Sequence, residues 1–150
     1  MDALQRLVEI EAIKQLKARY FRYVDTFNLE GWLTVFTDDV VCRYEKGVNT
    51  PEKTWQVDGK KGITDYWTMN KNRVQSVHHG HMAEIEILSD TEARAIWAME
   101  DIVEFTDALM HGYGHYHEKY VKVDGEWLIK ELHLTRLRVQ QTYIGKVAPD

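Results

Sequence analysis

His78 and Asp25 are the two residues of this sequence whose types could form a proton-transfer pair. Asp25 lies in the mostly apolar segment Tyr20-Phe-Arg-Tyr-Val-Asp25-Thr-Phe27, near the predicted end of a long helix. His78 opens the segment His78-His79-Gly80-His81 at the predicted start of a strand. A carboxylate that orients an imidazole inside an apolar cavity makes that imidazole an effective general base. If the fold brings the two together, the pair predicts an enzyme rather than an inert domain.

Strand alternation adds two further polar candidates, Asp101 and Arg136. In the predicted strand 92–105, Asp101 shares one face with apolar residues, which are Ala95, Trp97, Met99, Val103 and Phe105. In the predicted strand 126–139, Arg136 shares a face with Leu132 and Leu134. A charge that faces an apolar interior needs a partner. We therefore expect Asp101 and Arg136 to be each other's partners or to be polar groups of a cavity.

Simple alternation conflicts with an inward position for His78. It places His78 on the same face as Glu84 and Glu86, whose side chains we expect in solvent. A β-bulge inserts one extra residue and reverses the alternation. We therefore predict a bulge at Gly80, which would turn His78 toward the interior.

Two histidine pairs allow a metal site as an alternative. His79 and His81 alternate onto one face of their strand, as do His115 and His117, and paired His-x-His strands can bind a divalent metal. No acidic ligand stands at a recognisable spacing beside either pair. We therefore expect a site that works with neither a metal nor another cofactor. Cys42 has no base beside it in the sequence and is not expected to be a nucleophile.

The elements that must position these residues fall into two halves. Apolar residues at helical spacing predict a helix over 2–27, and shorter helices follow over 29–36 and 63–69, with a strand over 40–44 between them. The second half predicts long strands over 76–88, 92–105, 112–123 and 126–139. Asp124-Gly125 between the last two is a hairpin signal. Helices followed by antiparallel strands predict an α+β fold, in which a bent sheet wraps around helices.

Composition limits the class of protein. The 150 residues fit a single domain over 1–150. No apolar run approaches the ~20 residues that span a bilayer, and the first six residues lack the apolar core of a signal peptide. The net charge of −5, with no basic run, argues against a nucleic-acid partner. The lone Cys42 makes a reducing, cytoplasmic location the expectation.

Several segments resemble a known family. Ile10 to Asp25 is similar to the opening helix of the bacterial bile acid 7α-dehydratases, His78-x-Gly80-His81 to their catalytic histidine segment, Met99-Glu-Asp101 to their Leu-Glu-Asp strand and Lys119 to Gly125 to a hairpin of these enzymes. The resemblance covers nearly the whole chain. It identifies the chain as similar to the SnoaL-like branch of the nuclear transport factor 2-like (cystatin-like) superfamily. The histidine segment and the helix aspartate also resemble hexachlorocyclohexane dehydrochlorinase and, more distantly, scytalone dehydratase.

The resemblance implies a fold, a site and an activity. The implied fold is a cone-shaped α+β barrel, with the N-terminal helices packed in the concave face of a curved, mainly antiparallel sheet. The implied site residues are Tyr20, Asp25, His78, Asp101 and Arg136. The implied activity is a cofactor-free dehydratase that acts on a small hydrophobic hydroxy-ketone with a steroid-, polyketide- or aromatic-like skeleton. A ketosteroid isomerase-like or polyketide cyclase-like enzyme and a non-catalytic ligand- or protein-binding module are the alternatives, because fold membership alone does not fix function.

Two features qualify what the resemblance implies. The segment between Phe105 and Gly114 is shorter than in the bile acid enzymes, so we expect a different pocket mouth. Tyr20 stands where the dehydrochlorinases have lysine, which counts against dehalogenation.

The C-terminal segment 140–150 carries apolar residues that a monomer would leave uncovered, namely Tyr143, Ile144 and Val147. We therefore expect a homo-oligomer, a trimer as in the resembling enzymes, or else a dimer.

Overall fold

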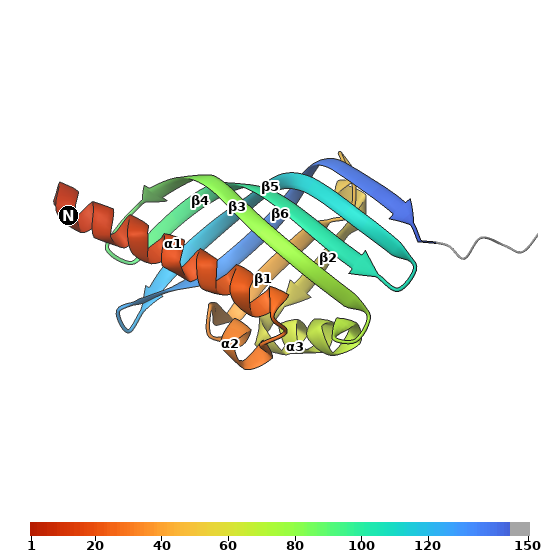
Figure 1. The fold of residues 1–150 in the computed structure, drawn as a ribbon. Helices are drawn as coiled ribbons and strands as arrows, with labels where there is room; N and C mark the ends of the chain where they lie inside the picture. Colours follow the sequence, from red (N-terminus) through yellow and green to blue (C-terminus); the bar gives the residue numbers. More distant parts are fainter. Residues whose placement is uncertain (145–150) are drawn as a thin grey trace, which may run out of the picture.

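The computed structural model of the chain describes residues 1–144, which form an α+β fold with helices before the long strands, as predicted (Figure 1). In chain order the elements are α1 (Ala3–Asp25), α2 (Leu29–Leu33), β1 (Phe36–Glu45), the 3-10 turn η1 (Pro51–Lys53), β2 (Thr54–Asp58), α3 (Gly59–Asn70), β3 (Val74–Ile87), β4 (Glu92–Phe105), β5 (Ala108–Val123) and β6 (Glu126–Tyr143). Among these residues, none of the helices has the length and apolar character that a membrane span requires.

The sheet is curved and mixed, with strand order β2-β1-β6-β5-β4-β3. Neighbouring strands pair antiparallel, except that β1 and β6 are parallel. Figure 1 shows α1 lying across one face of the sheet, with α2 and α3 grouped near its C-terminal end. The core fills the space between these layers, with Ile13, Leu16 and Tyr20 of α1 packed against buried residues of the sheet. The mainly antiparallel sheet around N-terminal helices is therefore confirmed.

Helix α1 begins and ends close to the predicted bounds, but its N-terminal half is less buried than its apolar pattern suggests. The Asp2 side chain caps the helix by accepting a hydrogen bond from the Gln5 N–H at 2.8 Å. Leu4, Leu7 and Val8 are 72%, 63% and 53% exposed. The first turns extend past the sheet, as Figure 1 shows, so these residues meet no core.

Two charged residues of α1 are buried. The sequence pattern of the helix instead predicts that its charged residues face solvent. Lys17 is 1% exposed and forms an ion pair with Glu118 of β5 at 2.5 Å. Glu9 is 4% exposed and accepts hydrogen bonds from Trp127 and Lys122, both at 2.7 Å. Each buried charge is thus matched by a polar partner across the helix–sheet interface.

The region between α1 and β3 differs most from the prediction. The helix expected over 29–36 ends at Leu33, because Phe36 already begins β1 as a fully buried strand residue. Strand β2 was not predicted, since it is only five residues long and flanked by turn signals. Helix α3 begins at Gly59, four residues earlier than expected, and the positive φ of Gly59 (67°) makes the turn into it.

The last two strands follow the predicted hairpin. Val123 pairs with Glu126, and Asp124 and Gly125 between them have φ of 50° and 86°, as a type I′ turn requires. Strand β4 also has its predicted bounds.

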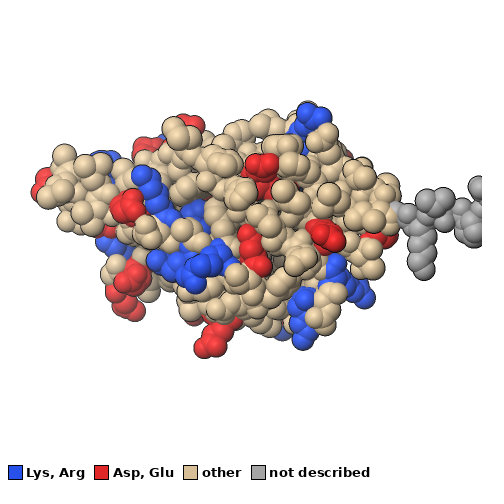
Figure 2. Space-filling model, viewed as in Figure 1, with Lys and Arg blue, Asp and Glu red and all other residues tan. Residues whose placement is uncertain are grey.

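Charged side chains are mixed over the face that carries α1. Figure 2 shows acidic and basic groups interspersed there, separated by uncharged residues.

Candidate active site

A bulge in β3 turns His78 toward the interior of the sheet. The register with β4 is regular from Val74 to His81 and shifts by one residue between His81 and Glu84. Met82 is the extra residue, with a φ of 37° and 93% exposure. The predicted bulge therefore exists, but its placement at Gly80 was wrong. Inward and outward positions exchange at Met82, so His78 faces inward although Glu84 and Glu86 face solvent.

Gly80 has a different role, because the absence of a side chain there allows helix α1 to pack closely against β3. A Cβ atom at this position would lie 2.7 Å from Cε2 of Phe21. The ring of Phe21 in turn lies nearly parallel to the His78 imidazole, with centroids 6.3 Å apart and an interplanar angle of 11°. The absence of a side chain at Gly80 thus lets Phe21 pack beside His78.

Asp25, at the C-terminal end of α1, contacts His78 directly. Its Oδ1 lies 2.6 Å from His78 Nδ1, and its Oδ2 accepts a hydrogen bond from the His78 backbone N–H at 2.8 Å. The Ser76 hydroxyl donates a third bond to Oδ1 at 3.0 Å. An ionised carboxylate only accepts hydrogen bonds, so the proton of a neutral His78 lies on Nδ1 and Nε2 presents a lone pair.

Both side chains of the pair are sheltered but accessible. The exposed fractions are 15% for His78 and 19% for Asp25. His78 also lines a cavity between the sheet and the helices. This arrangement can remove a proton from a molecule in the cavity, with Asp25 stabilising the imidazolium that forms.

Asp101 and Arg136 form a buried bidentate ion pair beside His78. Arg136 Nη1 and Nη2 donate to the two Asp101 oxygens at 2.6 and 2.8 Å, and the Arg136 and Asp101 side chains are 7% and 4% exposed. Asp101 is the cross-strand partner of His78. Both residues also line the cavity. Asp101 and Arg136 are therefore each other's partners and also form the polar part of the cavity wall.

Gly112 on β5 makes room for this ion pair. A Cβ atom there would lie 2.2 Å from both Arg136 Nη1 and Asp101 Oδ1. Any side chain at this position would therefore displace the two charges from each other.

Tyr20 lies at the inner end of the cavity and is 2% exposed. Burial holds the pKa of Tyr20 well above its usual value, and it does the same for the pKa of Tyr44 and of Tyr116, which also line the cavity. These three phenols therefore stay protonated around neutral pH and can donate hydrogen bonds.

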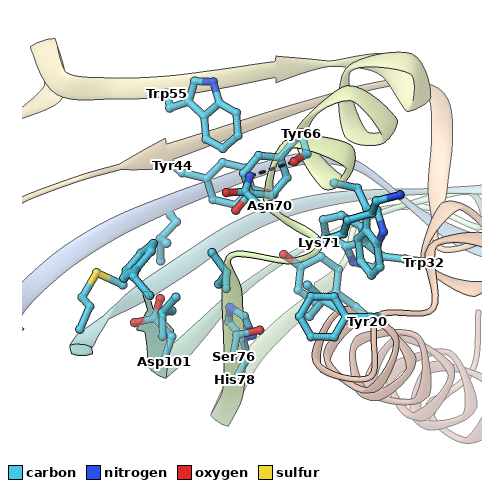
Figure 3. Close-up of a pocket in the computed structure, with 18 of the residues that line it drawn as sticks. Tyr20, Trp32, Tyr44, Trp55, Tyr66, Asn70, Lys71, Ser76, His78 and Asp101 are labelled. Atoms are coloured by element: carbon cyan, nitrogen blue, oxygen red, sulfur yellow. Dashed lines mark hydrogen bonds between the residues drawn. The ribbon is translucent and has the colours of Figure 1, made fainter. Parts of the chain in front are cut away.

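Aromatic residues outside the predicted site form the opposite wall of the cavity. Trp55 of β2 and Tyr66 of α3 have ring centroids 4.1 Å apart, and Tyr44 of β1 stacks on Tyr66 at 6.4 Å. Figure 3 shows this group on one side of the cavity and Ser76, His78 and Asp101 on the other. The cavity has a volume of about 170 Å³. Trp32 also lines it, and its buried indole N–H has no hydrogen-bond partner among the described residues.

The amino-acid composition indicates the aromatic wall only weakly. The chain has eight Tyr and five Trp, which indicate an aromatic pocket in general. Only the pairing of β2 with β1, which aligns Trp55 with Tyr44, identifies the rings that meet.

The remaining histidines and Cys42 lie away from the cavity. His79 and His81 are exposed on the outer face of β3, and Glu100 of β4 lies beside them. This acidic group comes from the adjacent strand, so the spacing within the His79-x-His81 segment could not reveal it. Cys42 is fully buried, and burial raises the pKa of its thiol to about 12, which leaves it unreactive.

A family model described as a SnoaL-like domain matches residues 5–133, which is most of the chain. This span includes most of α1 and all of β3 and β4, with Tyr20, Asp25, His78 and Asp101. Arg136 lies just beyond the match.

Solved structures of similar fold cover nearly the whole chain. One, described as a putative scytalone dehydratase from Novosphingobium aromaticivorans, has 23% sequence identity and a TM-score of 0.78, covering 96% of this chain and 94% of its own. Another is a hexachlorocyclohexane dehydrochlorinase, LinA type 3, from Novosphingobium barchaimii, with 18% identity and a TM-score of 0.80, covering 99% and 100%. A variant of a protein of unknown function from Mycobacterium tuberculosis has 23% identity and a TM-score of 0.76, covering 92% and 77%. At these identities the likeness establishes a shared fold.

Proposed function

Because the chain belongs to the SnoaL-like domain family, we propose that it is a cofactor-independent dehydratase that removes water from a small aromatic hydroxy-ketone. The observation that carries the proposal is the 2.6 Å contact between Asp25 and His78 at the wall of an aromatic cavity. The names of two fold relatives, one a putative dehydratase and one a dehydrochlorinase, are consistent with elimination chemistry.

The proposed reaction uses one proton relay through His78. Nε2 removes a proton from the carbon next to the substrate carbonyl, and the electron pair moves to the carbonyl oxygen. The resulting enolate expels the hydroxyl group from the next carbon, and this group takes the proton back from the imidazolium and leaves as water. Asp25 stays ionised throughout and stabilises the imidazolium. A positioned base of this kind contributes about 10²–10⁴-fold, and orientation and enolate stabilisation must supply the rest.

Tyr20 and the Asp101–Arg136 pair have supporting roles in this proposal. A protonated Tyr20 donates a hydrogen bond to the carbonyl oxygen or to the departing hydroxyl. The ion pair fixes the polar end of the cavity, because its bidentate geometry leaves little freedom to either side chain. Its position next to His78 across β3 and β4 suits contact with the leaving group.

The cavity volume narrows the substrate class. An apolar cavity of about 150 Å³ holds one benzene molecule, whereas pockets for drug-sized ligands reach ~300–1,000 Å³. The 170 Å³ cavity therefore favours a skeleton of one or two rings over a four-ring steroid. The adjoining rings of Trp55 and Tyr66 favour a flat apolar body, with its polar end toward His78.

A substrate screen tests the proposed activity. One- and two-ring hydroxy-ketones should gain ultraviolet absorbance when the enzyme creates a conjugated double bond, and His78→Ala should not produce this change. An isomerase would shift a double bond without loss of water, and a cyclase would join two carbons, so mass spectrometry of the product separates the three reactions. Binding of these compounds without any product would contradict the proposal and support the non-catalytic alternative.

The exposed apolar residues support a homo-oligomer. Tyr143 and Ile144 are 72% and 55% exposed, and Leu137 of β6 is 64% exposed. Val147, part of the same expectation, lies outside the described residues. We propose a trimer, with a dimer as the next candidate, working in the cytoplasm.

A further inference from the structure

Six of the seven histidines lie away from the cavity, on the outer face of the sheet, where they form two groups. One consists of His79 and His81 of β3 with Glu100 and His111, and the other of His115, His117 and His133 with Glu45. Within residues 1–144, His79, His81 and Glu100 are the set whose ligand atoms all lie within 4.8 Å of one another. From this geometry we propose that His79, His81 and Glu100 bind a divalent transition-metal ion that clamps β3 to β4.

The spacing of the three groups suits an ion. His81 Nε2 and Glu100 Oε2 are 3.8 Å apart, which is too long for a hydrogen bond. Two ligands of a tetrahedral zinc ion lie ~3.4 Å apart when each is about 2.1 Å from the metal. His79 pairs with Glu100 across the strands, so the backbone already places all three side chains over one spot. Rotation of the exposed His79 and His81 side chains would close the site around an ion.

His111 contacts one carboxylate oxygen of Glu100, and His81 lies near the other. His111 Nε2 lies 2.6 Å from Glu100 Oε1, and the His111 ring stacks on Tyr113 with centroids 4.6 Å apart. Such a contact orients a ligating carboxylate and typically raises metal affinity by ~10–100-fold. Two neutral imidazoles and one carboxylate also match the preference of Zn²⁺ and its neighbours in the transition series.

The position of the site gives the ion a structural role. The ladder between β3 and β4 is interrupted directly after His81, at the Met82 bulge that turns His78 inward. An ion bound by β3 and β4 would hold the two strands together at this interruption. It would lie behind the inward-facing pair His78 and Asp101, outside the cavity, so it would stabilise the fold without joining the chemistry.

Calorimetric titration of untagged protein with Zn²⁺ at slightly alkaline pH tests the proposal, because metals bind the neutral form of imidazole. The expected result is one ion per chain, with affinity reduced ~10-fold or more in both His81→Ala and Glu100→Gln. The matched control His117→Ala, an exposed histidine of the second group, should bind as the unchanged protein does. At a roughly hundredfold excess of Zn²⁺ over its Kd, the melting temperature should rise by about 5–10 °C in the unchanged protein and in His117→Ala only.

Three results would overturn the clamp. The first is a Kd weaker than about 1 mM for the unchanged protein. The second is an equal loss of affinity in His117→Ala and His81→Ala, which would indicate adventitious binding by surface histidines. The third is unaltered binding by Glu100→Gln. Chelation should leave turnover unchanged, so failure of the clamp and failure of the proposed dehydratase are distinguishable.

Discussion

The buried pair of Lys17 and Glu118 supports the inner end of the cavity and offers a sharp test of the packing. The ammonium group lies 2.5 Å from Glu118 Oε1, and the two side chains are 1% and 0% exposed. Lys17 Nζ also lies 3.7 Å from the ring centroid of Tyr116 and 4.0 Å from that of Tyr20. The Tyr120 hydroxyl donates to the other oxygen of Glu118. Removal of either charge leaves the other buried with incomplete compensation.

The expected loss follows from this burial. Lys17→Met should lower the free energy of unfolding by about 3–5 kcal/mol, which is typical when one partner of a buried ion pair is removed. For a domain of this size, ~1 kcal/mol corresponds to about 2–4 °C, so the melting temperature should fall by about 6–20 °C. The double variant Lys17→Met/Glu118→Gln should be more stable than Lys17→Met alone, because it leaves no unpaired charge.

The single variant Glu118→Gln adds a pH signature. Burial already lowers the pKa of Lys17, whereas the charge of Glu118 raises it. Without Glu118 the folded protein binds the lysine proton more weakly still, while the unfolded chain holds it up to a pH of about 10.4. The unfolded state then binds more protons, so the stability of Glu118→Gln should rise as pH increases through the interval between the two pKa values.

Urea denaturation of the four proteins at several pH values measures these quantities. A cost below about 1 kcal/mol for both single variants, with no coupling in the cycle, would refute the account of the buried pair. A pH-independent stability of Glu118→Gln would refute the charge argument specifically.

Three further predictions concern the ion pair, the outer histidines and the assembly. Gly112→Ala should cost about 1–3 kcal/mol in urea denaturation and reduce turnover, because its Cβ would lie 2.2 Å from Arg136 Nη1 and Asp101 Oδ1; an unchanged midpoint would contradict that geometry. The pKa of His117 is lowered by partial loss of hydration and by the neighbouring imidazoles of His133 and His115, so the unfolded state binds its proton first. Stability should therefore fall as pH drops below about 6.5, and His117→Gln should lessen this fall, which urea midpoints on either side of that pH would measure. Light scattering at micromolar concentration should give the mass of a trimer, or of a dimer, and a purely monomeric mass would show that Tyr143 and its apolar neighbours need no cover.

The long elements and the inward charges were predictable because each depends on local periodicity. Alternation along β4 and β6 placed Asp101 and Arg136 on the interior face, and the hairpin at Asp124-Gly125 follows from backbone preference alone. Strand alternation and turn preferences can be read within a single strand or turn, without knowing which other segments pack against it.

The features that were missed depend on contacts between distant segments. The bulge lies at Met82 rather than Gly80. Gly80 instead makes room for Phe21 of α1, and the sequence of β3 alone does not reveal this contact. A lysine such as Lys17 is normally expected on the solvent-facing side of a helix. Its burial depends on the ion pair with Glu118, which is 101 positions away in the sequence. The position of Glu100 beside His79 likewise depends on the pairing of β3 with β4.

The proposed dehydratase mechanism requires that His78 and Asp25 act as a unit. Asp25→Asn keeps the shape of the side chain but removes the charge that stabilises the imidazolium, and His78→Ala removes the base. His79→Ala is the matched control, since that imidazole belongs to the neighbouring residue and lies on the outer face of the sheet.

The decisive measurement is kcat/KM for these variants and for the double variant, each verified as folded by circular dichroism. We expect His78→Ala and Asp25→Asn each to lose on the order of 10²–10⁴-fold. The double variant should lose little more than His78→Ala alone, and His79→Ala should stay close to the unchanged enzyme. Full activity of His78→Ala, together with an inactive His79→Ala, would contradict the proposed mechanism.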